Sequence, residues 1–141
     1  MSTLGIQVAV QVQDEIAQAL RHAGVRKTGG MLFGEVVTPH RVRIIEATVE
    51  GEGSFASFTR RVSRGKRFSR RFMKKHAHAY QQYNYVGEWH SHPSFTLSPS
   101  ITDSESMRGI LQEIPHAHFV LLLIVRLREK LEIGAFCWQR G

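Results

Sequence analysis

The sequence predicts an α/β (α+β) fold in which a single mixed β-sheet is flanked by helices. Segments with helical spacing alternate along the chain with strand-like segments, and several neighbouring strands are close enough in sequence to form hairpins. A chain of 141 residues with 42% apolar residues is long enough to bury one core. We therefore expect a single domain that spans residues 1–141.

The first half of the chain predicts a strand, a helix and a hairpin. A short strand is expected at 6–10, and residues 11–23 carry apolar side chains at helical spacing with Gly24 as a typical helix end. Residues 30–37 and 42–47 then predict two paired strands around a turn that contains Pro39. A loop at 51–54 and an edge strand at 55–58 are expected to follow.

The second half predicts two helices and three strands. A long helix is expected at 66–83, because four apolar or aromatic residues fall there at helical spacing. Residues 84–90 favour a strand, and a helix near 102–113 should end before Pro115. Strands at 118–126 and 130–139 should form a final hairpin.

The composition limits the cellular setting. Cys137 is the only cysteine, which excludes an internal disulfide, and its place in an alternating strand predicts a small core residue. The first residues lack the charged and then apolar pattern of a signal peptide, and the longest apolar run, 119–125, is too short to span a membrane. We expect a cytoplasmic protein.

Residues 88–103 contain the most informative pattern in the chain. His90 and His92 are two residues apart, so on a strand both imidazoles project from one face and can converge on one ion. Ser100 and Asp103 follow, and Asp103 lies in or near the first turn of the next predicted helix. Two histidines and one carboxylate leave the fourth position of a zinc ion open, as in catalytic zinc sites. The pattern predicts a zinc hydrolase with His90, His92 and Asp103 as the metal ligands.

Simpler explanations exist for parts of this pattern. Two other His-x-His pairs occur, at 76/78 and 116/118. The first pair lies in a predicted helix, where residues i and i+2 point apart, and the second has no aspartate nearby in the sequence. Ser100 and Asp103 alone are also what the start of a helix favours. The combined pattern is more specific than any of its parts.

The sequence Glu88-Trp89-His90-Ser91-His92-Pro93, together with Ser100 and Asp103, resembles the JAMM motif of the JAB/MPN zinc metallopeptidases. The segment 28–34 resembles the glycine-bearing early strand of that family, and the order of predicted elements fits over residues 5–138. The resemblance is closest to the stand-alone prokaryotic, deubiquitinase-like type. It implies the JAB/MPN (cytidine-deaminase-like) architecture and a zinc cofactor, with Ser100 hydrogen-bonded to the developing oxyanion.

The resemblance also implies a reaction and its partners. Members of the family are isopeptidases or peptidases that cut after the flexible C-terminal Gly-Gly tail of a ubiquitin-like protein. Activating and conjugating enzymes of the same pathway are further implied partners. Gly29 and Gly30 are candidates to let the substrate backbone approach closely, with a strand bulge as the alternative. Phe95 is a candidate to line the substrate groove, with loop packing as its alternative.

One position departs from the family pattern. Lys27 stands where members usually carry a catalytic glutamate that takes a proton from the zinc-bound water, and an ammonium beside zinc cannot do this. The chain is then inactive and binds the tail without cutting it, or another carboxylate substitutes, or the register is different. Glu88 is the preferred substitute, because it shares the strand face of His90 and His92, although orienting a ligand is its alternative role. Glu50 and Glu52 are further candidates, for which a salt bridge with Lys27 is the favoured role.

The net charge of +7 is concentrated in one segment. Nine of the nineteen Lys and Arg residues fall within 60–75, and no acidic residue occurs from 53 to 87. A solvated helix face is the leading interpretation, and a docking face for an acidic protein comes second. Nucleic acid is the weakest of the three candidates, because no known nucleic-acid-binding motif occurs.

Overall fold

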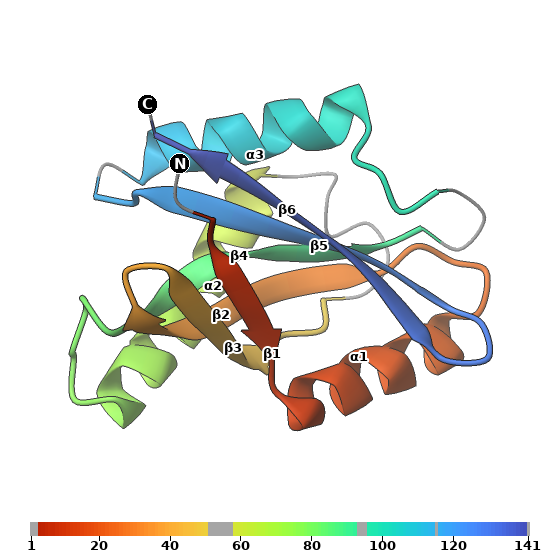
Figure 1. Ribbon diagram of the computed structural model, residues 1–141, viewed down its shortest axis with the longest axis horizontal. Helices are drawn as coiled ribbons and strands as arrows, with labels where there is room; N and C mark the ends of the chain where they lie inside the picture. The colour runs from red at the N-terminus through yellow and green to blue at the C-terminus, as the bar shows by residue number, and fades with distance from the viewer. Residues whose placement is uncertain (1–2, 51–57, 93–95, 115, 141) are drawn as a thin grey trace.

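A mixed sheet forms the centre of the computed structural model, which describes residues 3–50, 58–92, 96–114 and 116–140 (Figure 1). Within helix α2 the side chains are described from Arg67 onward. The strands are β1 (Gly5–Val8), β2 (Gly29–Thr38), β3 (Arg41–Ala47), β4 (Tyr83–Ser91), β5 (Phe119–Leu127) and β6 (Leu131–Gln139). The helices are α1 (Val10–Ala23), α2 (Phe58–Lys75) and α3 (Ile101–Glu113). No helix among the described residues has the length and apolar character needed to cross a membrane.

The strands follow the order β1-β3-β2-β4-β5-β6. Strand β2 pairs antiparallel with both β3 and β4, whereas β1/β3 and β4/β5 are parallel pairs. Strands β5 and β6 form the expected antiparallel hairpin. The mixed sheet flanked by helices confirms the predicted fold class, and it places β4 in the interior of the sheet between β2 and β5.

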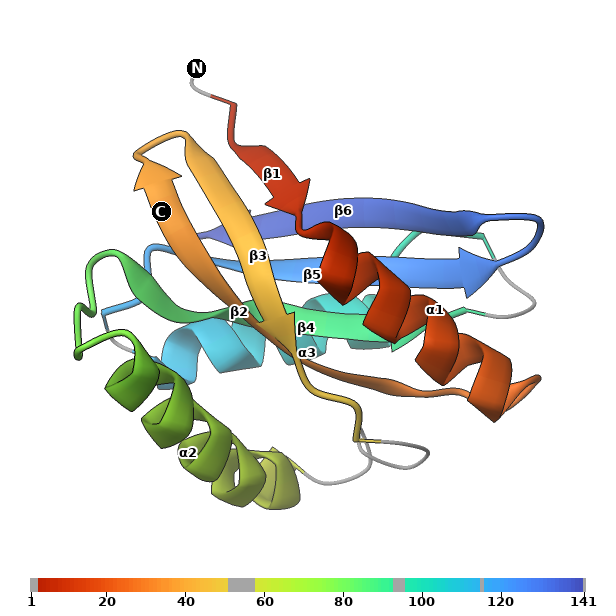
Figure 2. The same cartoon turned by 90° about the horizontal axis from the view of Figure 1, so that it is seen from below.

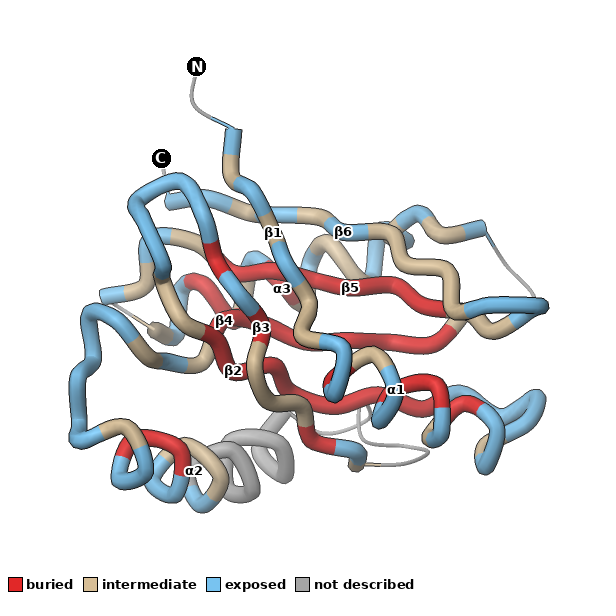
Figure 3. Tube along the Cα trace, turned by 60° about the horizontal axis from the view of Figure 1, so that its bottom comes forward, coloured by how far each residue is buried: buried red, intermediate tan, exposed pale blue. Residues whose placement is uncertain are grey.

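The helices cover both faces of the sheet (Figure 2). Helix α1 packs Val12, Ile16 and Leu20 against alternate residues of β5 and against Trp89 of β4. On the other face, α3 packs against the remaining residues of β5, and α2 packs against β2. Figure 3 shows the buried positions running along β2, β4 and β5. Strand β5 is covered on both faces, which explains why its sequence is a continuous apolar run.

Helix α2 corrects two predictions. The helix begins at Phe58, for which an edge strand was expected, while residues 55–57 lie outside the described ones. It ends at Lys75 rather than at Tyr83, because Ala77 and His78 adopt positive φ angles of 55° and 56°, which no helix continues. Tyr83 instead starts β4, opposite Glu35 of β2.

Cys137 corrects a third prediction, because its side chain is exposed rather than part of the core. Its neighbours Phe136 and Trp138 face α3, so Cys137 points to the other face of the sheet. Strand β6 is the edge strand of the sheet. Helix α1 packs against β5 and against strands on the other side of β5 from β6. Alternation along an edge strand therefore leaves this position uncovered.

Candidate active site

Strand β4 fixes the direction of the two histidines. Gly87 has a φ of +155°, and a Cβ there would collide with the carbonyl group of Leu121, so only glycine fits. The register of β4 against β2 shifts at this point, which forms a bulge. After the bulge Trp89 is fully buried against α1, and His90 therefore faces the side of the sheet that carries α2 and α3.

Helix α3 brings Asp103 to the same side of the sheet. Met107 lies one turn after Asp103 on the same helix face and is buried against Leu122 and Ile124 of β5. Ile124 is the cross-strand partner of His90. The packing of α3 on β5 therefore places the Asp103 carboxylate beside β4, as predicted from the sequence.

The carboxylate of Asp103 contacts both histidines. Oδ1 lies 3.4 Å from Nδ1 of His90, and Oδ2 lies 3.5 Å from Nε2 of His92. The His90 imidazole lowers the pKa of Asp103 well below its ordinary value of 3.8, and hydrogen bonding from Ser100 adds to this effect, whereas burial works against it. Asp103 is therefore ionised at neutral pH and supplies an anionic oxygen to each imidazole.

The orientation of His92 follows from its second contact. Nδ1 of His92 lies 3.1 Å from the backbone carbonyl oxygen of Thr96. A carbonyl oxygen only accepts, so Nδ1 is the donor in this contact, and Nε2 is directed at Asp103. Metal-ligating histidines are commonly oriented by such a hydrogen bond from the other ring nitrogen.

The spacing of these donors agrees with zinc ligation. Two ligands at 2.0–2.1 Å from a tetrahedral zinc ion lie roughly 3.3 Å apart, and the two N···O distances here are 3.4 and 3.5 Å. Over the described ranges, no three His, Cys, Asp or Glu side chains already converge on one point that could hold a metal ion. The donors therefore fit zinc in chemistry and in pairwise spacing.

Ser100 begins helix α3. Its hydroxyl accepts a hydrogen bond from the Asp103 N–H at 3.0 Å, and Oδ2 of Asp103 accepts one from the Ser100 N–H at 2.8 Å. This capping box is the simpler role expected for the pair, and it fixes the Asp103 side chain toward the histidines. Ser100 is exposed, and its hydroxyl keeps a proton to donate because the capping bond uses only a lone pair.

Lys27 lies at the edge of this site. Gly29 is the cross-strand partner of His90. Thr28 and Ser91 come next, and they exchange two hydrogen bonds: the Thr28 N–H donates to Oγ of Ser91 at 2.8 Å, and the Ser91 N–H donates to the Thr28 carbonyl at 2.9 Å. Lys27 itself precedes the paired residues of β2, and it is exposed.

Glu88 lies deeper than a substrate-facing carboxylate would. Its side chain is 2% exposed, and Oε2 accepts a hydrogen bond from the Tyr85 hydroxyl at 2.9 Å. Strand alternation puts Glu88 on the face of His90, and its bond from Tyr85 engages one carboxylate oxygen there. This placement favours the alternative role considered for Glu88, in which it orients its neighbours.

The two glycines of β2 face opposite sides of the sheet. Gly29 is the cross-strand partner of His90 and shares its face. A Cβ on Gly30 would collide with the carbonyl group of Thr48, which accepts the indole N–H of Trp89 at 2.8 Å. Gly30 therefore serves backbone packing on the α1 face, and Gly29 is the one placed to face a substrate.

Some candidates cannot be placed against the site. Phe95 and Glu52 lie outside the described residues. Glu50, a candidate for a salt bridge with Lys27, donates its N–H to the Gly29 carbonyl at 2.8 Å.

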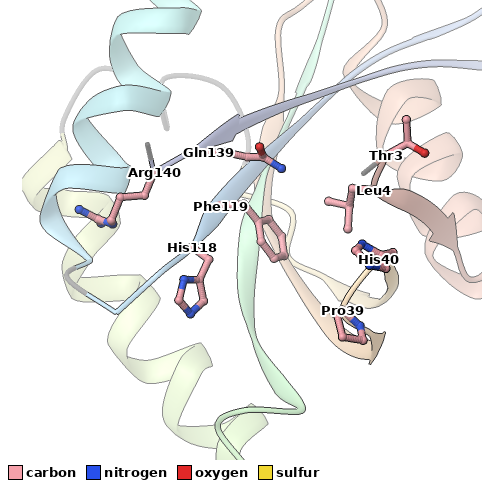
Figure 4. A pocket seen from close by; sticks show the side chains of 8 residues that line it. All are labelled: Thr3, Leu4, Pro39, His40, His118, Phe119, Gln139 and Arg140. Carbon is pink, nitrogen blue, oxygen red and sulfur yellow. The ribbon is translucent and has the colours of Figure 1, made fainter. Parts of the chain in front are cut away.

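The other His-x-His pairs lie elsewhere. His76 stacks on Tyr83 with ring centroids 4.1 Å apart. His118 lines a cavity of about 260 Å³ at the opposite end of β5 from the site (Figure 4). Arg140, which also lines that cavity, donates to the carbonyl group of residue 111 in the last turn of helix α3 and to those of residues 114 and 117 after it. Neither pair adjoins an aspartate among the described residues.

Sequence reasoning did not identify three residues that support the site. Ser91 attaches Thr28 to the end of β4, Thr96 orients His92, and Gly87 sets the face to which the histidines point. The glycine inside a strand pattern was a usable signal of a bulge. No sequence signal indicates the Thr96 carbonyl, because any residue supplies that group.

Comparison with solved structures supports the same architecture. A solution structure of a protein from Desulfitobacterium hafniense superimposes with a TM-score of 0.62 at 17% identity, covering 96% of this chain and 85% of that one. The crystal structure of a JAB1/MPN domain protein from Archaeoglobus fulgidus gives a TM-score of 0.51 at 14% identity, covering 94% and 88%. At such low identity these similarities establish the fold.

Sequence relatives identify the family. A curated protein of Enterobacter hormaechei subsp. hoffmannii (strain UCI 50), named CD-NTase/cGAS isopeptidase, is 36% identical over 100 residues. The match covers 70% of this chain and 53% of the relative, so the chain spans about half the length of that protein. The family described as prokaryotic homologs of the JAB domain matches residues 9–139, which is most of the chain. The chain belongs to this prokaryotic JAB family, which includes isopeptidases.

Proposed function

We propose that this domain is a zinc-dependent isopeptidase that acts after the C-terminal glycine of a ubiquitin-like protein. The observation that carries the proposal is the meeting of His90 and His92 at the two oxygens of Asp103. Three such donors at the end of an interior strand, with an exposed serine beside them, match the layout of a catalytic rather than a structural zinc site. Membership of the JAB family supports the same reaction class.

The residues of this chain have separate tasks in the reaction. His90, His92 and Asp103 would hold the zinc, which when bound lowers the pKa of a coordinated water and polarises the scissile carbonyl. The Ser100 hydroxyl is placed to donate a hydrogen bond to the oxygen that gains negative charge, an effect worth about 3–4 kcal/mol for one such donor. Thr96 and the capping box hold two of the ligands in position.

The substrate is proposed from the family and the site together. Gly29 is the cross-strand partner of His90 and contributes no side chain there, and a narrow groove at such a position would admit glycine and exclude larger residues. The relative from Enterobacter is named for CD-NTase/cGAS, which makes an enzyme of that class a candidate carrier of the isopeptide bond. Activating and conjugating enzymes of the same pathway remain proposed partners.

Lys27 favours a second candidate, in which the domain binds the tail and cuts it slowly or not at all. By its resemblance to the JAMM pattern Lys27 stands where a general base would act, and an ammonium cannot accept a proton from water beside zinc. Glu88 is buried against Tyr85 and is poorly placed to substitute. On this account the ligands are intact and the proton acceptor is missing.

Cleavage of a ubiquitin-like fusion protein in the presence of zinc distinguishes the two candidates. The chain is compared with Lys27→Glu, and Arg26→Glu is the control for adding an acidic residue one position away. Activity in the unchanged chain supports the isopeptidase, and Glu88→Gln then tests the remaining carboxylate. Activity only in Lys27→Glu supports the tail-binding domain. If neither the unchanged chain nor Lys27→Glu cleaves the fusion protein, although zinc is bound and the fold is intact, both candidates are contradicted.

A further inference from the structure

We propose that the outer face of α2 is a docking surface for an acidic protein whose carboxylates are spaced as on one face of a helix. The surface is a row of four exposed cations, Arg67, Arg70, Arg71 and Lys74. The inference does not depend on the reaction proposed above, because none of the four residues belongs to the candidate active site. It assigns a partner to a concentration of charge that the isopeptidase function leaves unexplained.

The four cations form a single row along the helix. They are separated by three, four and seven residues, so they share one face of α2 over roughly 10 Å of its length. Phe72 and Met73 bury the opposite side of the helix against Met31 and Phe33 of β2. Figure 2 shows α2 at the periphery of the molecule. The row therefore points to solvent, where a partner can reach it.

Carboxylates of this chain do not neutralise the row. Among the described residues, the ion pair of this helix joins Lys75 to Glu46 at 3.9 Å, and none of the four cations takes part in it. Arg67 and Arg71 are one turn apart, as are Arg70 and Lys74, and like charges at that spacing destabilise a helix. The carboxylates of a partner would replace these repulsions by attractions, so binding relieves a cost that the free chain carries.

Arginine is the cation best suited to carboxylates, and three of the four residues are arginines. Its guanidinium group donates from a planar fork to both oxygens of one carboxylate. Cζ of Arg71 lies 5.7 Å from the centre of the Phe68 ring. This contact orients the guanidinium group before a partner arrives, and it occupies none of the N–H donors. The row is thus partly organised for an anion.

The borders of the row favour a protein over nucleic acid. A phosphate chain that continued past Lys74 would meet the carboxylate of Glu46 beside Lys75, whereas an acidic patch on a protein can end there. The aromatic rings in the described part of α2 are not available to stack on bases, because Phe72 is buried and Phe68 lies beneath Arg71. The row therefore fits a short set of carboxylates better than a long polyanion.

The test is fluorescence anisotropy at about 0.15 M salt, with a dye-labelled helical peptide of about fifteen residues as the probe. Four glutamates stand in it at positions i, i+3, i+4 and i+7. The same peptide with four glutamines is the charge control, and a short DNA duplex is the third probe. We expect the glutamate peptide to bind at least about tenfold more tightly than the other two, since four charge pairs of ordinary strength add to that difference.

Two variants locate the binding on the chain. Arg70→Glu should weaken binding of the glutamate peptide by at least about tenfold, because it places a like charge within the row. Arg108→Glu, at an exposed position of α3, changes the net charge by the same amount and should leave the affinity within about twofold. Circular dichroism of both variants verifies that the fold is kept.

Three results would overturn the proposal. Absence of binding of the glutamate peptide at about 1 mM would leave the row as a solvated face. An equal loss of affinity in Arg70→Glu and Arg108→Glu would assign the binding to net charge. Tighter binding of the DNA duplex than of the glutamate peptide would assign the row to nucleic acid. Each of these results leaves the proposed isopeptidase function intact, because zinc binding and cleavage are measured separately.

Discussion

Thr28 and Ser91 are joined by two hydrogen bonds, one from the Thr28 N–H to the Ser91 hydroxyl at 2.8 Å and one from the Ser91 N–H to the Thr28 carbonyl at 2.9 Å. Both residues are buried, with 3% and 2% of their surface exposed. The serine between the two histidines of the motif therefore attaches the residue that precedes β2 to the end of β4.

Ser91→Ala tests this link. The substitution leaves the buried Thr28 N–H without its acceptor, so we expect a loss of about 1–3 kcal/mol in the free energy of unfolding. Chemical denaturation at equilibrium measures it, with Ser98→Ala at an exposed loop position as the control. A loss no larger than that of the control would contradict the role given to Ser91.

Gly30 and Gly109 should respond in opposite directions to alanine. A Cβ at Gly30 would collide with the Thr48 carbonyl, which is fixed by its bond from Trp89, so Gly30→Ala should cost about 1–3 kcal/mol. A Cβ at Gly109, within α3, has no neighbour within 4 Å, so Gly109→Ala should stabilise the protein by about 0.5–1 kcal/mol. Thermal unfolding of the two variants checks the opposite signs, and equal effects would contradict the close approach of β3 to Gly30.

The charge of Asp103 should stabilise the metal-free fold only above acidic pH. Its pKa is lower in the folded than in the unfolded chain, so the stabilisation is complete above the ordinary value of 3.8 and is lost as the pH falls below it. Asp103→Asn keeps an oxygen that accepts from Ser100 but removes the charge, and we expect it to cost about 1–2 kcal/mol near pH 7. Urea titrations in chelator from pH 7 to pH 3 should show this difference shrink. A difference that stays constant over that range would contradict the assigned pKa.

The exposed basic face of α2 should repel itself. Arg67, Arg70, Arg71 and Lys74 are exposed, and the only ion pair in the described part of this helix joins Lys75 to Glu46 at 3.9 Å. Arg70→Glu places an acid one turn before Lys74, which should stabilise the helix by about 0.3–0.5 kcal/mol at low salt. The gain should vanish near 1 M salt, because exposed pairs are screened. Arg70→Gln is the control, and an equal gain there would attribute the effect to the loss of charge alone.

The same face provides a test of the nucleic-acid interpretation. If the basic face of α2 is only solvated, it should bind a short DNA duplex only at low ionic strength. We therefore expect no measurable binding at about 0.15 M salt. A filter-binding or anisotropy titration over salt concentration measures this. Retained binding at that salt, weakened by Arg70→Glu, would restore nucleic acid as a partner.

The regular parts of the fold could be predicted because local pattern and tertiary position agree in them. Alternation around Pro39 predicted the β2/β3 hairpin, and the apolar run of β5 agrees with a strand covered on both faces. Helix α2 was misplaced because its basic residues carry little apolar pattern, and because the left-handed Ala77 and His78 have no signal of the kind that glycine gives. Tyr83 fits helical spacing but gains a strand partner in Glu35, which only the tertiary structure supplies.

In the candidate site, too, some features could be predicted from the sequence and others could not. The proximity of His90, His92 and Asp103 could be predicted, because strand alternation and a helix start both follow from the spacing in the sequence. Their role as metal ligands stays a prediction. The burial of Glu88 and its hydrogen bond from Tyr85 could not be predicted, because sharing a strand face with His90 reveals neither of them. Cross-strand neighbours such as Thr28 and Ser91 depend on a register that a bulge can shift by one residue.

The central claim is that His90, His92 and Asp103 form one zinc site, and zinc titration against a competing chromogenic chelator tests it most directly. We predict one equivalent of tightly bound zinc in the chain, and a loss of at least tenfold in affinity for His92→Ala and Asp103→Ala. His78→Ala, which removes an exposed histidine after α2, should leave the affinity unchanged. No bound zinc in the folded chain, or equal affinity in all three variants, would contradict the account.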